Sequence, residues 1–223
     1  MTRVSGFVGV ESYDLVLYLA KVAKYLYDFD KDGNHLGEAS VLVLDKSNDN
    51  SLRSCIDFID NMDGETVNYC GFEFATSCSD FSDYTIVLIY YGRNLEEDFS
   101  ICDDLYLVTD YQKHNTEVIK EINVGETTYP FLVVRDRINS KITPDSIFYD
   151  TDTCVHFTSK ENDLIEIQDT QSDLAARVAL QYDGRIDMRG LSESMNSFII
   201  KALNADYQEK DIKTAIKKAV KEK

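Results

Sequence analysis

The 223-residue chain has little of what marks secreted, zinc-binding or membrane-spanning proteins. Its five cysteines form no C-x-x-C pair, and its three histidines do not stand at zinc-ligand spacing, which favours a reduced, cytoplasmic protein. No run approaches the roughly 20 apolar residues that span a bilayer, and the first residues lack a cleavage pattern. With only two prolines and no biased tract, the composition is that of a folded globular chain.

Positive charge is also scarce, because 23 basic residues face 40 acidic ones and the net charge is -17. Repulsion from a phosphate backbone excludes nucleic acid as the main partner. The exception is residues 210–223, with six lysines and two acids. We therefore expect an α/β domain over residues 1–207 and a basic amphipathic helix over 208–223. The apolar face of that helix is thin, so it should contribute little to the core, and peripheral membrane contact is not favoured.

Short runs rich in Val, Ile, Leu, Phe and Tyr predict strands that are covered on both faces. These runs are residues 4–10, 39–44, 85–90, 105–109, 129–135 and 153–157, with a shorter one at 67–74. Helices are predicted at residues 13–27, 51–61, 115–122, 172–181, 192–203 and 209–222. The alternation indicates an α/β fold, a doubly wound and mostly parallel sheet with helices on both faces and the first strand near its centre.

In such sheets, ligands bind where the strands end, so the turns after Val10, Leu44, Ile89, Thr109 and Arg135 are informative. The first turn reads GVESY and has one glycine, a carboxylate and no lysine. A working phosphate loop needs glycines, a lysine for the phosphates and a Ser or Thr for magnesium.

The order of elements resembles the ParA/MinD superfamily of deviant Walker-A ATPases over most of residues 3–204. Five short segments carry the resemblance: FVGVESYDLVLYLA, VLVLDKS, DYTIVLIYYG, DDLYLVTDYQKHN and LVVRDRIN. They match, in order, the phosphate loop with its helix, a strand ending in aspartate, the Walker-B strand, an A-D-x-V-x-L-V-T-x-P segment and a strand ending in Asn-Arg. The resemblance implies a P-loop NTPase-like fold.

Most catalytic positions of that family carry other residues here. The signature lysine falls on Phe7, the last loop glycine on Glu11, the Walker lysine on Ser12, the magnesium threonine on Tyr13, the Walker-B aspartate on Leu88 and the adenine-reading asparagine on Arg135. Asp45 alone stands where the family has its aspartate. Phosphoryl transfer depends on these charges, so the resemblance implies a pseudo-ATPase without catalytic residues, metal or cofactor.

A degenerate nucleotide site would comprise Gly9, Glu11, Ser12, Tyr13 and Asp45. Ser12 is placed to cap the following helix, Asp14 lies in its first turn, and Glu11 would repel a triphosphate. ATP is therefore disfavoured.

These features predict a scaffold, adaptor or localisation factor in a bacterial cytoplasm. The degeneracy resembles that of the TadZ/CpaE-like factors of pilus assembly. A homodimer formed through the loop face is expected, with Tyr13 as its anchor. Two alternatives stay open: an atypical nucleotide-binding switch, and a receiver-like regulatory domain with Asp45 as phosphoacceptor.

Two further motifs carry less weight. Residues 28–33, DFDKDG, copy the first half of an EF-hand loop, but Ala39 stands where the bidentate glutamate belongs. Cys154 and His156 would share one face of a strand, which permits contact without implying a nucleophile.

Overall fold

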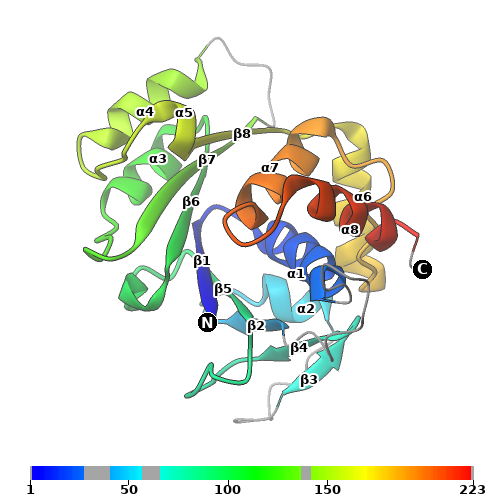
Figure 1. Cartoon of the computed structure of the whole chain (residues 1–223). Coiled ribbons are helices and arrows are strands. Elements are labelled where there is room, and N and C mark those ends of the chain that lie inside the picture. The colour runs from blue at the N-terminus through cyan, green and yellow to red at the C-terminus, as the bar shows by residue number, and fades with distance from the viewer. Residues whose placement is uncertain (1, 28–40, 57–65, 137–141, 222–223) are drawn as a thin grey trace.

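One eight-stranded sheet runs through the protein in the order β3-β4-β2-β5-β1-β6-β7-β8 (Figure 1). The computed structural model describes residues 2–27, 41–56, 66–136 and 142–221. The strands are β1 (Arg3–Gly9), β2 (Val41–Asp45), β3 (Val67–Tyr69), β4 (Phe72–Ala75), β5 (Ile86–Gly92), β6 (Asp104–Asp110), β7 (Tyr129–Asp136) and β8 (Leu164–Gln168). All neighbouring strands pair in parallel except β3 and β4. The predicted fold class is confirmed.

Helices cover both faces of the sheet, and two apolar clusters lie beneath them. The helices are α1 (Tyr13–Tyr27), α2 (Ser51–Cys55), α3 (Lys113–Lys120), α4 (Pro144–Asp152), α5 (Lys160–Asp163), α6 (Gln171–Asp183), α7 (Glu193–Leu203) and α8 (Glu209–Ala219), with a 3₁₀ turn η1 (Phe99–Ile101). The larger cluster joins one face to α1, α6, α7 and α8, and the smaller joins the other face to α3 and α4. Figure 1 shows the same division.

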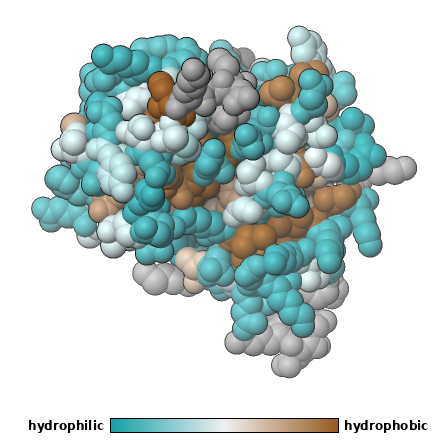
Figure 2. All heavy atoms as spheres, turned by 90° about the horizontal axis from the view of Figure 1, so that it is seen from above, coloured by the Kyte–Doolittle hydropathy of each residue, from teal (hydrophilic) through white to brown (hydrophobic). Residues whose placement is uncertain are grey.

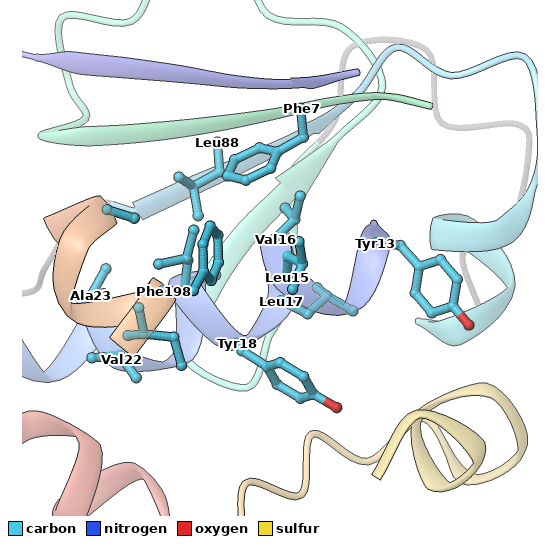
Figure 3. Packing of buried hydrophobic residues seen from close by; sticks show 14 of the residues in the cluster. Phe7, Tyr13, Leu15, Val16, Leu17, Tyr18, Val22, Ala23, Leu88 and Phe198 are labelled. Atoms are coloured by element: carbon cyan, nitrogen blue, oxygen red, sulfur yellow. The ribbon is translucent and has the colours of Figure 1, made fainter. Parts of the chain in front are cut away.

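Helix α1 is the centre of the larger cluster. Its side chains from Tyr13 to Ala23 are all buried, as its nearly continuous apolar sequence predicts. Phe7 of β1 and Leu88 of β5 lie on its sheet side, and Phe198 of α7 packs into the same cluster (Figure 3). The predictions of a central first strand and a buried first helix are confirmed, since β1 lies between β5 and β6.

The strand predicted at residues 153–157 is wrong. This segment forms a turn between α4 and α5, and the last strand is β8. Val155 and Phe157 are apolar because they pack into the smaller cluster from that turn. Strand β8 escaped prediction because its side chains alternate between buried and more exposed positions, as at the edge of a sheet.

The single strand predicted at residues 67–74 is instead an antiparallel hairpin of β3 and β4. Cys70 and Gly71 form its turn, and both have positive φ, at 51° and 83°. Positive φ at both central residues matches the right-handed twist of a hairpin, so the Cys-Gly pair reverses the chain. The predicted helix at 51–61 is seen as α2, and its remainder from residue 57 lies outside the described residues.

The C-terminal helix is part of the core. Helix α8 lies against α1 and α7, and Ile212, Ala215 and Ala219 are buried in the larger cluster (Figure 1). The expectation that residues 208–223 contribute little to the core is therefore wrong. Lys213 and Lys217 are exposed, while the thin apolar face of the helix packs against the chain itself.

Candidate functional site

The turn between β1 and α1 is short and tied to the neighbouring strand. Gly9 ends β1 with φ of 121°, and a Cβ at this position would collide with the carbonyl oxygen of Val108 in β6. The Val10 N–H donates to the same oxygen at 2.9 Å. Strand β1 continues through Gly9, so only Val10, Glu11 and Ser12 connect it to α1. Part of the segment that matches a phosphate loop is therefore strand here, and the Val10 N–H is already bonded.

Ser12 and Tyr13 face the interior. Ser12 is fully buried, and its hydroxyl has no hydrogen-bond partner among the described residues, so its predicted capping role is wrong. Tyr13 is fully buried too, and its ring extends from the side of α1 away from the strands (Figure 3). Burial raises the pKa of its hydroxyl, and the Asp14 carboxylate adds to this. The prediction of Tyr13 as a dimer anchor is wrong, because its surface is covered within the chain.

Four charged side chains form a buried cluster behind this turn, named here the ion cluster: Asp14, Arg135, Asp169 and Arg177. Arg135 donates to both Asp14 oxygens, at 2.9 and 3.0 Å, and to Asp169 Oδ1 at 2.8 Å. Arg177 donates to Asp14 Oδ2 through Nε at 3.1 Å and Nη2 at 2.9 Å. Two positive and two negative groups meet here, so the cluster is formally neutral.

The ion cluster also fixes the turn itself. Arg135 Nη1 donates to the carbonyl oxygen of Glu11 at 3.3 Å. Burial alone would raise the pKa of Asp14, but Arg135 and Arg177 outweigh it and hold the pKa well below its usual range. Asp14 is therefore ionised at neutral pH in the first turn of α1, where helix N-termini favour negative charge. The start of this helix thus carries a carboxylate of the chain itself, neutralised by two arginines.

Asp45 ends β2 and lies buried at the edge of the site. Its carboxylate accepts from the Ser47 N–H at 2.9 Å, the Ser47 hydroxyl at 2.6 Å and Arg53 Nε at 2.8 Å. Burial raises the pKa of Asp45 despite these bonds. Its oxygens are bonded to Ser47 in the loop before α2 and to Arg53 of α2, which leaves them poorly placed to attack a phosphoryl donor.

A pocket of about 410 Å³ lies at the carboxyl ends of the central strands. Chain connections from β1 and β6 lead to opposite sides of the sheet, through α1 to β2 and through α3 to β7, so this is the topological switch point. Residues lining it are Gly9, Val10, Glu11, Asp49, Ser51, Arg93, Asp110, Gln112, His114 and Asn115. Figure 2 looks onto this end of the molecule, where hydrophilic atoms surround smaller hydrophobic patches.

The pocket contains only two of the predicted site residues, Gly9 and Glu11, while Ser12, Tyr13 and Asp45 do not line it. Apart from Val10 after β1, the other lining residues stand at or after the ends of β2, β5 and β6, where the strand pattern predicts informative turns. Asp110 accepts from Asn115 Nδ2 at 2.8 Å, and Arg93 Nη2 donates to Asn115 Oδ1 at 2.8 Å. Three carboxylates and one guanidinium line the pocket, which makes it unfavourable for a polyphosphate.

No group of three potential metal ligands occurs among the described residues. The EF-hand-like segment 28–33 lies outside them. Cys154 and His156 are exposed and belong to the turn between α4 and α5, so the shared strand face assumed for them is wrong. Within the described ranges, no helix is both long and apolar enough to cross a membrane.

Introducing the missing lysine as Ser12→Lys should not create a nucleotide site. The position is fully buried, and the ion cluster already balances its own charges, so a new ammonium group would be buried without a partner. We expect a loss of ~2 kcal/mol in the free energy of unfolding and no ATP turnover. Urea denaturation and a phosphate-release assay measure both. Ser12→Ala is the matched control and should be neutral, because the hydroxyl it removes has no partner.

Comparison with known proteins gives matches among solved structures only. Neither a family model nor a curated protein sequence matches the chain. Among solved structures, the crystal structure of a ParA family ATPase from Chlorobium tepidum TLS is similar, with a TM-score of 0.50 and 15% sequence identity over 98% of each chain. At this identity the likeness concerns the fold alone, and it shows that the chain has a P-loop NTPase-like α/β fold of the ParA type.

Proposed function

We propose that the protein is a pseudo-ATPase, a non-catalytic scaffold or localisation factor that works through protein contacts and uses no nucleotide. The observation that carries this proposal is the ion cluster behind the first turn. Asp14 lies in the first turn of the helix that a phosphate loop precedes, and it is paired with Arg135 and Arg177 instead of a ligand. The charges at the start of this helix are balanced within the chain.

The lining of the pocket supports the same proposal. Glu11, Asp49 and Asp110 would face any polyphosphate bound at the switch point, with Arg93 as the one guanidinium among the lining residues. Phosphoryl transfer needs cations or a metal ion to balance the developing charge. Leu88, at the Walker-B position, and Tyr13, at the magnesium position, are both buried apolar or aromatic side chains. No cofactor and no hydrolysis are therefore expected.

The setting is proposed as a bacterial cytoplasm, in keeping with five cysteines that are all free thiols. A role like that of the TadZ/CpaE-like factors, in pilus or secretion-system assembly, would use the fold in this way. The receiver-like alternative is less well supported, because Asp45 is committed to Ser47 and Arg53. Its sheet order also differs from the 2-1-3-4-5 order of flavodoxin-like folds.

The second candidate is a nucleotide-binding switch, which the pocket at the switch point favours. Purified full-length chain should be titrated with fluorescent ATP and GTP analogues in the presence of magnesium, and turnover should be followed by phosphate release. We expect no saturable binding and no turnover above background.

The contrary outcome is specific. Saturable binding that Arg93→Ala removes and Arg185→Ala leaves intact would establish the switch, since Arg93 lines the pocket and Arg185 does not. Magnesium-dependent turnover abolished by Asp45→Ala would overturn the pseudo-ATPase proposal altogether.

A further inference from the structure

Helix α6 exposes a row of large apolar side chains. Leu174, Val178 and Tyr182 are 44%, 53% and 84% exposed, although Ala176 and Leu180 of the same helix are buried in the core. A spacing of four residues places the three on one side of the helix, in a continuous row named here the α6 stripe. Helix α6 lies at the right-hand side of the molecule in Figure 1.

The exposed side of helix α6 itself carries almost no charge. The helix has three charged residues, and two of them, Asp173 and Arg177, are buried and bonded within the chain. The third, Asp183, is its last residue, and the other exposed positions are glutamine, serine or alanine. In α8, by contrast, the exposed positions are mostly lysine and acid residues. An uncharged helix face is therefore a local feature of this acidic protein.

We infer that two copies of the chain pair through the α6 stripe, with the helices antiparallel about a two-fold axis at Val178. Two bodies of charge -17 repel each other, so a contact between copies is least unfavourable where the surface is uncharged. A two-fold contact must be self-complementary. The stripe meets this condition, because Leu174 and Tyr182 stand four residues on either side of Val178.

The ends of the helix fit the same arrangement. A Cβ on Gly190 would lie 3.7 Å from Ser172, so the turn holding the exposed Arg189 lies beside the first turn of α6. Antiparallel pairing brings Asp183 of each copy toward this turn of the other, in which Arg185 and Arg189 share Asp187, so two positive charges and one negative leave a net charge of +1. The dipoles of two antiparallel helices also attract each other, because the positive end of each lies beside the negative end of the other.

The helix is also fixed before any contact forms. Thr170 and Asp173 make a capping box at its start, and Gly184 closes its end in the left-handed conformation. The contact is small, since 13 residues extend about 20 Å and one helix face falls short of the roughly 800 Å² per partner of a standard interface. We therefore expect a weak dimer, dissociating at micromolar concentrations.

Sedimentation equilibrium of the full chain, without nucleotide, tests the inference. Val178→Asp should weaken the dimer about 100-fold or more, because it places two like charges at the axis. Ile101→Asp is the matched control, since Ile101 is 49% exposed on η1, outside α6. It should leave the dimer unchanged. Higher salt should strengthen the wild-type dimer by screening the repulsion of the two bodies.

Circular dichroism melting of both variants should match wild type, because both side chains are exposed. A monomer at all concentrations, or a dimer indifferent to Val178→Asp, would overturn the α6 contact. A dimer that forms only with ATP would also overturn it, because it would indicate that the two copies meet at the pocket. The nucleotide titrations are independent of these measurements, so either the pseudo-ATPase proposal or the α6 dimer can be refuted without the other.

Discussion

Replacing Asp14 with alanine is expected to lower the free energy of unfolding by ~3–5 kcal/mol. The variant leaves Arg135 buried with only Asp169 as a carboxylate partner, and Arg177 loses its two shorter bonds. Breaking a buried ion pair from one side costs more than the pair contributes, because the two arginines would share one carboxylate and leave a buried positive charge that is neither balanced nor hydrated. Arg135, which donates to the Glu11 carbonyl oxygen, would also no longer be held in place by Asp14, so this hydrogen bond to the turn would weaken.

Urea denaturation of Asp14→Ala against Asp187→Ala isolates this effect. Asp187 is also held by two arginines, Arg185 and Arg189, but at the surface. Exposed pairs contribute about 0–1 kcal/mol, so the control variant should unfold close to wild type. Equal losses in the two variants would show that the ion cluster is no more important than a surface pair.

Acid unfolding provides a second readout of the same cluster. The pKa of Asp14 in the folded protein lies below its unfolded value of roughly 3.9, so its contribution is present above that pH and is lost as the pH falls. Wild type should therefore lose stability between about pH 5 and pH 2. Asp14→Asn should show a shallower decline over this range, because it has no carboxylate to protonate.

Local sequence patterns predicted most of the fold. Strand β1 and helix α1 are apolar at nearly every position, which is typical of elements covered on all sides. The strand predictions were wrong where the hydrophobic pattern of a segment depends on its position in the sheet. Strand β8 alternates because it is an edge, and the 67–74 run hides a turn whose Cys70 adopts a positive φ that a side chain seldom takes.

The candidate site was predicted in part, for a different reason. The sequence of the first turn alone shows that the lysine and the magnesium-binding threonine are absent, but it gives no sign of the ion cluster. Arg135 and Arg177 lie 121 and 163 residues away from Asp14 in sequence. Only the fold brings them together. The sequence therefore marks Arg135 only as the residue at the asparagine position of the family, whereas the structure shows it bonded to Asp14, Asp169 and the Glu11 carbonyl.

Under the proposed function, charges of the chain itself replace those of a ligand. In a phosphate loop, the helix N-terminus and a lysine meet an anion that comes from solution. In this chain Asp14 lies in the first turn of the helix, and Arg135 and Arg177 neutralise it. Folding alone brings these charges together, which supports the proposal of a protein whose shape does not depend on nucleotide.

Removing residues 208–223 is expected to cost ~5 kcal/mol or more, a large part of the 5–15 kcal/mol that stabilises an ordinary domain. Ile212, Ala215 and Ala219 cover α1, and without them the most buried helix of the protein would meet water along one side. Because α1 contacts β2, β4 and β5 as well as α7, its exposure would loosen the whole larger cluster.

Two point variants separate packing from charge in this last prediction. Ile212→Ala should lower the free energy of unfolding by ~2–5 kcal/mol, because a fully buried side chain is truncated. Lys217→Ala, on the exposed face of the same helix, should change it by no more than about 0.5 kcal/mol. Thermal melting of the truncated chain and both variants measures the effect. A truncated chain that melts cooperatively at the wild-type temperature would show that α8 is an appendage after all.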